Sequence, residues 1–139
     1  MRLRAAAAIV VLTGATPLAA QTGPVAVAEA FLKAVMAGDV VATRRLRTGD
    51  AAIAAGDVAG PIAEAEEVLV RFSQMKCSVG ALALSPEPVA ANLLGLSSVK
   101  SGGGRWVEGT MSCPMATGDT KKTPVRIAVV AGKVALFGF

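Results

Sequence analysis

Apolar residues recur with a helical period between residues 24 and 37, where Phe31 and Val35 fall on one face. Pro24 suits the first turn of such a helix, and Gly38 suits the position directly after its end. This pattern predicts the clearest helix of the protein.

A second, shorter helical pattern follows almost without a loop. Asp39 stands where the N-cap of a helix is expected, and this helix runs through Leu46 and ends near Gly49. Residues 50–60 have no clear period. We therefore expect a loop there, with room for a short edge strand around Ile53.

A third helical pattern opens at Pro61 and carries glutamates early and Arg71 and Lys76 late, in the order that the helix dipole favours. One face of this helix is apolar. It comprises Ile62, Ala65, Leu69 and Phe72.

After Cys77 the pattern changes to that of strands. The predicted strands cover residues 77–84, 89–99, 106–113, 125–130 and 133–139. Pro86 and Pro88 cannot continue a central strand, and Gly102 to Gly104 form a turn. Three helices followed by a run of antiparallel strands predict an α+β fold, in which the helices cover one face of a curved sheet.

The first twenty residues have the pattern of a cleavable secretory signal. Arg2 and Arg4 precede the apolar stretch 5–12, and small residues lead to a cleavage point after Ala20. The alternative is a retained membrane anchor, but a spanning helix needs about 20 apolar residues and Pro17 interrupts this one. We expect a soluble product in the periplasm or outside the cell, with one domain over residues 21–139.

Composition narrows the chemistry of that domain. Loss of Arg2 and Arg4 lowers the net charge from +4 to +2, which is too little to argue for nucleic acid as a partner. The chain has no histidine and no tyrosine, so it lacks the commonest general base, the commonest metal ligand and the phenolic proton donor. We expect no cofactor and no metal site.

The stretch from Val27 to Asp39, followed by residues 40–46, resembles the opening helix pair of the nuclear transport factor 2-like superfamily, in which an aromatic-led helix commonly ends in Ala-Gly-Asp. The helix from Pro61 and the closing hairpin 125–139 are similar to the same layout. The resemblance implies a cone in which a strongly bent sheet wraps the helices and leaves a pocket. Members use that pocket for catalysis or for binding, and sheet-mediated dimers are frequent among them.

Enzymes of this superfamily that resemble ketosteroid isomerase combine an aspartate base with tyrosine, and related hydratases use a His-Asp pair. This chain has no tyrosine or histidine for those roles. A carboxylate mechanism would use Glu108, which shares a strand face with Trp106, since an apolar neighbour can raise the pKa of a carboxyl group. Trp106, Glu108 and Asn92 are the candidate pocket residues, with a solvent-facing acid and a turn residue as the plain alternatives for Glu108 and Asn92.

Cys77 and Cys113 are the only thiols, and export makes a disulfide admissible. In a plain meander the two residues would lie at opposite ends of the sheet, too far apart for a bond that keeps Cα atoms within about 7 Å. A structural disulfide and two buried free thiols both remain open.

Three functions are compatible with these patterns. The first is a non-catalytic exported domain with a small apolar ligand in its pocket. The second is an interaction module that forms a homodimer through its sheet, supported if Trp106, Phe137 or Phe139 make an exposed apolar patch. The third is a lyase or isomerase with Glu108 as its base.

Overall fold

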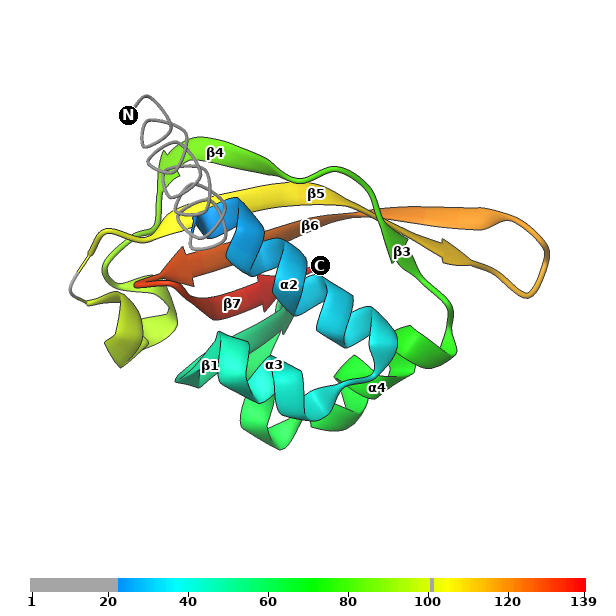
Figure 1. Ribbon diagram of the computed structural model, residues 1–139, viewed down its shortest axis with the longest axis horizontal. Coiled ribbons are helices and arrows are strands. Elements are labelled where there is room, and N and C mark those ends of the chain that lie inside the picture. The colour runs from blue at the N-terminus through cyan, green and yellow to red at the C-terminus, as the bar shows by residue number, and fades with distance from the viewer. Residues whose placement is uncertain (1–22, 101) are drawn as a thin grey trace, which may run out of the picture.

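The computed structural model describes residues 23–100 and 102–139, so the predicted leader and its cleavage point after Ala20 lie outside the described residues. Figure 1 shows the arrangement. The elements are α2 (Pro24–Ala37), α3 (Val40–Leu46), β1 (Arg47–Ala55), β2 (Val58–Pro61), the 3-10 turn η1 (Ile62–Glu64), α4 (Glu66–Gln74), β3 (Ser78–Val79), β4 (Ala83–Pro88), the 3-10 turns η2 (Leu93–Gly95) and η3 (Ser97–Val99), β5 (Arg105–Pro114), β6 (Thr120–Val130) and β7 (Lys133–Gly138).

The first helix forms as its sequence predicts, and the second forms but ends at Leu46, with Arg47 to Gly49 in β1 instead. Gly38 ends α2 in the left-handed conformation at φ 71°, which glycine adopts without steric cost, and its N–H donates to the carbonyls of Ala34 and Val35. Asp39 caps α3, because its carboxylate accepts a hydrogen bond of 3.1 Å from the N–H of Ala42.

The third predicted helix is confirmed with one break. Ala65 has non-helical angles and separates η1 from α4. Ile62, Leu69 and Phe72 are nevertheless buried together, as their shared face predicts. No helix in residues 23–100 and 102–139 has both the length and the apolar character needed to cross a membrane.

The sheet is mixed, and the prediction of a purely antiparallel sheet is wrong. Its strand order is β2-β1-β7-β6-β5-β3, and β4 also pairs with β5. β1 runs parallel to β7, with Ile53 beside Phe137, while the other pairs are antiparallel. Parallel neighbours need a long connection, and β1 and β7 have one, because all the other strands and α4 lie between them along the chain.

Residues 50–60 are not a loop. β1 lies inside the sheet between β2 and β7, and Ala51, Ala52 and Ile53 are all buried. Both faces of β1 are covered, so its sequence shows no alternation of apolar and polar residues.

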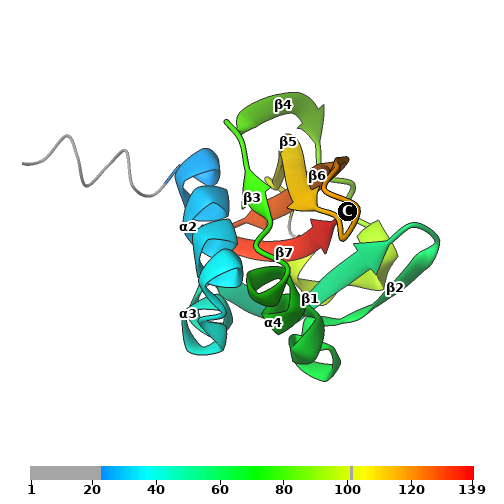
Figure 2. The same ribbon diagram turned by 90° about the vertical axis from the view of Figure 1, so that its right-hand side faces the viewer.

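Residues 89–99 are not a strand. They form the two short turns η2 and η3, with Val89 and Val99 buried at the two ends and Leu94 in the left-handed region at φ 47°. Gly104 makes the close approach of this segment possible, since a Cβ there would lie 2.8 Å from Val130 and 3.0 Å from Val89. Figure 2 shows the yellow-green segment 89–99 and α2 on opposite sides of the sheet.

The sheet therefore has two covered faces. We call the face that packs against the helices the inner face, and the face that segment 89–99 covers the outer face. The inner core comprises Val27, Ala28, Phe31, Leu32, Val35, Ala51, Ile53, Ile62, Leu69, Phe72, Cys77, Val107, Met111, Val125, Ile127, Val129, Val134 and Phe137. The outer core comprises Ala52, Val89, Val99, Trp106, Ala128, Val130, Ala135 and Leu136.

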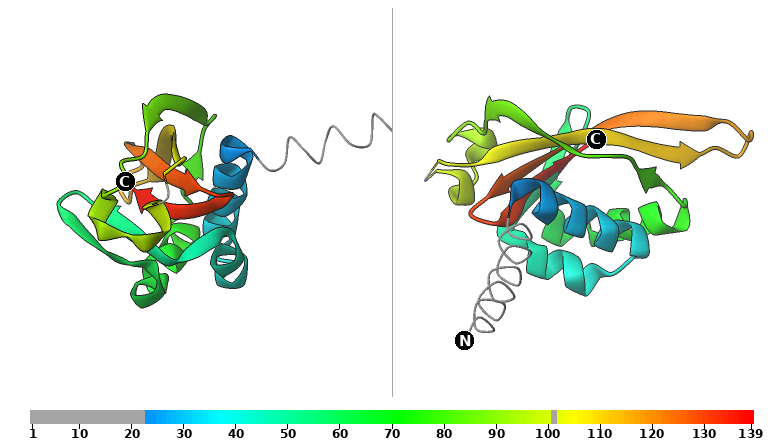
Figure 3. Two further views of the ribbon diagram at one scale, coloured as in Figure 1. Left: turned by 90° about the vertical axis from the view of Figure 1, so that its left-hand side faces the viewer. Right: turned by 45° about the horizontal axis from the view of Figure 1, so that its top comes forward.

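The hairpin of β5 and β6 extends beyond the rest of the sheet (Figure 3). Its register runs without interruption from Arg105 opposite Val129 to Pro114 opposite Thr120. β7 pairs with β6 only from Arg126 onward, so in the far part of this hairpin the two strands have only the short β3 beside them, at Met111 and Ser112.

Candidate functional site

The edge of the sheet nearest to α2 is irregular. β3 pairs with Ser112 and Met111 of β5, and β4 pairs with Glu108 and Val107. Between them residues 80–82 make a bridge that is held by one hydrogen bond of 3.1 Å from the N–H of Gly80 to the carbonyl of Thr110. This bridge forms one wall of a groove.

Gly109 makes the bridge possible. A Cβ on Gly109 would lie 2.5 Å from Cδ2 of Leu82, a separation that real Cβ atoms do not show. The missing side chain leaves space on the inner face of β5, and Leu82 fills it. A glycine within a strand is a usual sign of such a close approach.

A groove of about 470 Å³ runs between the bridge and α2. This volume lies within the usual range of small-molecule sites, about 300 to 1,000 Å³. Figure 2 shows β3 between α2 and β5, with α2 alongside. The lining residues are Glu29, Ala30, Leu32, Lys33, Met36, Val79, Gly80, Ala81 and Leu82.

The groove has an apolar floor and a charged rim. Leu32 is buried, and Met36 and Leu82 are half-buried against the inner core. Glu29 and Lys33 are exposed one turn apart on α2, and in residues 23–100 and 102–139 neither has an opposite charge within 4 Å. The groove can hold an apolar body, and its rim can bind polar groups of either sign.

Four phenylalanine rings pack together between the helices and the sheet. Phe137 lies 5.7 Å from Phe31 and 5.8 Å from Phe72 between ring centroids, and Phe139 lies 5.0 Å from Phe72. These separations are those of packed aromatic pairs. The four rings occupy the region where the superfamily resemblance implies a pocket, so the open groove is the better candidate for a ligand site.

The predicted site residues Trp106 and Glu108 lie on the outer face, away from the groove. Trp106 is 8% exposed, and the guanidinium carbon of Arg126 lies 4.2 Å from its ring centroid. Glu108 is exposed, and its Oε2 lies 3.0 Å from Nε of Arg126. Glu87 binds the same arginine at 3.0 Å.

Asn92 is exposed at the start of η2, in the segment that covers the outer face. The structure thus places Trp106 and Glu108 on one face, where both contact Arg126. Asn92 is not among the residues that line the groove. Among the described residues no three His, Cys, Asp or Glu side chains gather as metal ligands would.

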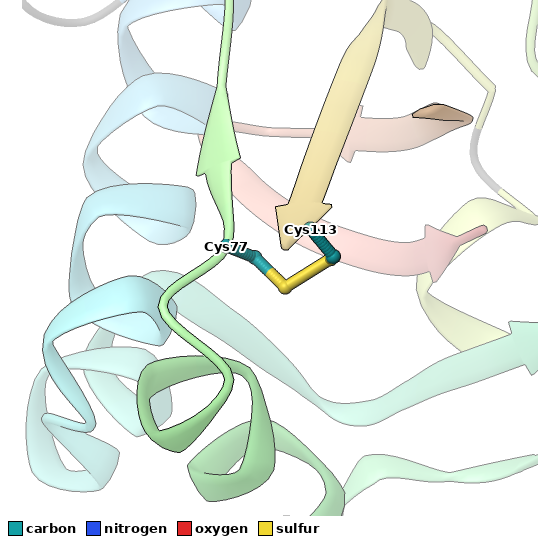
Figure 4. Close-up of a disulfide and its surroundings, with 2 residues drawn as sticks. All are labelled: Cys77 and Cys113. Atoms are coloured by element: carbon teal, nitrogen blue, oxygen red, sulfur yellow. A yellow bond between two sulfur atoms is a disulfide. The ribbon is translucent and has the colours of Figure 1, made fainter. Parts of the chain in front are cut away.

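Cys77 and Cys113 form a disulfide, with their Cα atoms 4.2 Å apart (Figure 4). A plain meander would have placed the two cysteines at opposite ends of the sheet. That expectation is wrong because residues 89–99 form no strand. β3 and β5 are direct antiparallel neighbours, with Ser78 opposite Ser112, so the two cysteines stand beside each other. On the chain-entropy account a loop of this length contributes roughly 3 to 4 kcal/mol.

Comparisons with known proteins identify similar solved structures and no similar sequence family. No protein-family model matches the chain, and no curated protein matches it. Among solved structures, Rd1NTF2_04 with long sheet is 11% identical at a TM-score of 0.55, over 81% of this chain and 94% of that one.

Two bacterial proteins, each described as "a putative polyketide cyclase", are also similar. The protein from Xanthomonas campestris is 15% identical at a TM-score of 0.54, over 81% of this chain and 87% of that one. The protein from Pseudomonas putida KT2440 is 16% identical at a TM-score of 0.54, over 82% and 87%. These likenesses show that the chain has the nuclear transport factor 2-like fold, as its opening helix pair predicts. At such identities they show the fold alone.

Proposed function

We propose that this protein is an exported, non-catalytic binding module that holds a small apolar ligand in the groove between α2 and residues 79–82. One observation carries the proposal: the interior of the cone is packed with four phenylalanines, while an open groove of about 470 Å³ with an apolar floor lies beside it. Burial of an apolar ligand against Leu32, Met36 and Leu82 supplies the binding energy.

A lyase, isomerase or cyclase activity has less support. Glu108, the expected base, is exposed on the outer face, paired with Arg126, and is not among the residues that line the groove. In the groove itself the titratable side chains are Glu29 and Lys33, both on the solvent-exposed rim. Acid–base chemistry is favoured where the site excludes water, and these two side chains are open to solvent.

Export is part of the proposal. The leader pattern of residues 1–20 supports cleavage after Ala20, and the Cys77–Cys113 disulfide is compatible with an oxidising compartment such as the periplasm. A homodimer through the sheet has weaker support. Trp106 and Phe137 are buried and Phe139 is half-buried, so these residues do not form the exposed apolar patch that such an interface would use.

The groove can be tested with the neutral apolar dye Nile red. Protein expressed from the full chain and purified from the cell envelope should bind the dye, and Ala30→Trp should weaken binding at least tenfold because Ala30 is exposed on α2 and lines the groove. Ala37→Trp is the matched control, since Ala37 is exposed on the same helix outside the groove. Equal dye binding by all three proteins would exclude the groove as the site.

Native mass spectrometry of the same preparation checks the other parts of the proposal. The expected result is a chain that begins at Gln21, is two daltons lighter than its reduced form and retains a small molecule. A chain that keeps residues 1–20 would contradict cleavage of the leader.

A further inference from the structure

Two hydrogen-bond donors in the wall of the groove have no partner in the protein. The N–H of Gly80 donates to Thr110, but the next two N–H groups, those of Ala81 and Leu82, have no acceptor in residues 23–100 and 102–139. Both residues line the groove. Strand pairing therefore leaves two backbone donors unused in residues that line the groove.

The opposite wall supplies a positive charge. Lys33 lies on α2 facing the same groove, and in the described part of the chain no carboxylate lies within 4 Å of it. Free backbone N–H groups and a cation are groups that bind anions in proteins, and charge-assisted hydrogen bonds are the stronger kind. The polar groups around Lys33 thus complement an acceptor with negative charge.

Glu29 sets a limit on how the ligand can lie. It stands one turn before Lys33 on α2, about 5 to 6 Å away between Cβ atoms, and its carboxylate repels an anion. An anionic head group therefore binds at the Lys33 side of the groove, and the rest of the ligand follows the apolar floor of Leu32, Met36 and Leu82.

We propose that the ligand is an amphipathic carboxylate: an apolar chain whose carboxyl group binds Lys33 and the N–H groups of Ala81 and Leu82. This inference rests on the proposed binding function and names the chemical class that the groove selects. A monocarboxylic acid of medium chain length has this chemistry, since it combines one anionic acceptor with an unbranched apolar tail.

Octanoate, 1-octanol and octylamine separate the head group from the tail, because the three compounds share a chain and differ in charge. In isothermal titration of the protein purified from the envelope, octanoate should bind at least tenfold more tightly than octylamine. Titration of labelled protein followed by NMR should shift the amide signals of Ala81 and Leu82 with octanoate and leave them nearly unchanged with 1-octanol.

Variants at the rim test the same point from the protein side. Lys33→Gln should remove the preference for octanoate while 1-octanol binds as before, and Lys122→Gln is the matched control, since Lys122 is exposed on β6 away from the groove. Glu29→Gln should strengthen octanoate binding severalfold. Retention of the preference in Lys33→Gln, or tighter binding of octylamine than of octanoate, would overturn the inference.

Chain length distinguishes failure of this inference from failure of the proposed function. In an apolar groove affinity should rise by up to about fourfold per added methylene, whatever the head group. A chain-length dependence without a carboxylate preference leaves the binding module in place and refutes the carboxylate. Absence of binding by all three compounds at every chain length contradicts both.

Discussion

The inner and outer faces of the sheet are both covered, but by different kinds of structure. On the inner face α2 and α4 pack regular helical faces onto the strands, and Phe31, Phe72 and Phe137 interlock there. On the outer face an irregular segment with two short turns covers a smaller cluster around Trp106.

The ion pairs on the two sides of the sheet differ in how far they are exposed to solvent. On the helix side Glu66 joins α4 to Arg44 of α3 and Arg47 of β1, at 2.7 and 3.2 Å, and Arg47 is 8% exposed. On the outer face Arg126 binds Glu87 and Glu108 in an exposed cluster. Since exposed ion pairs contribute little, we expect the inner side to determine stability and the outer side to tune it.

The largest expected effect is in the inner core. Phe137→Ala removes a fully buried ring that packs against three other rings, and it should lower the free energy of unfolding by about 3 to 5 kcal/mol. Val99→Ala is a smaller change in the outer core and should cost about 2 kcal/mol, because it removes two buried methyl groups. Urea denaturation followed by circular dichroism measures both, and equal losses would contradict the ranking of the two faces.

The two faces also differ in how well the sequence predicts them. The helical period of residues 24–37 and the caps Gly38 and Asp39 predict the inner side, because an amphipathic helix with caps has a local signal. β1 has no such signal, since its alanines are covered on both sides. Segment 89–99 has the apolar composition of a strand. Its place over the outer face depends on contacts with distant strands, which the local sequence does not show.

The candidate site, too, could be predicted from the sequence only where its features are local. The alternation of β5 is confirmed, since Val107 and Met111 face the helices while Trp106 and Glu108 face the other way. Alternation shows which residues share a face, but it does not show which face the helices cover. The groove depends on residues far apart in the chain, and Gly109 within a strand was its one local sign.

The next expected effect concerns Glu66 and pH. The hydrogen bond from Arg44 is the main cause that lowers the pKa of Glu66 from 4.5 to about 2; burial opposes this shift, and the bond from Arg47 adds to it. A carboxyl group whose pKa is lower in the folded state stabilises the fold above its unfolded pKa. That contribution is lost as pH falls from about 4.5 towards 2.

Glu66→Gln should therefore lower the free energy of unfolding by about 2 kcal/mol at pH 7, an amount reduced from the full shift because Arg44 is largely exposed. The difference between wild type and variant should shrink as pH approaches 2. Denaturation at a series of pH values checks this, with Glu67→Gln as the control because Glu67 is exposed on the same helix turn. A difference that is constant with pH would rule out the ion pair as its cause.

The smallest expected effect is at Arg126 on the outer face. Arg126→Met removes two ion pairs whose partners are 66% and 46% exposed and keeps an apolar cover over Trp106, so the loss of stability should be about 1 kcal/mol or less. Trp106 is the only tryptophan, and its fluorescence therefore reports this face alone. Its emission should change in the variant while circular dichroism stays the same.

High salt should lower the stability of the wild type towards that of the variant, because exposed ion pairs are screened. A loss as large as that of Glu66→Gln would show that the exposed cluster matters as much as the half-buried one, and the distinction between the two faces would then rest on apolar packing alone.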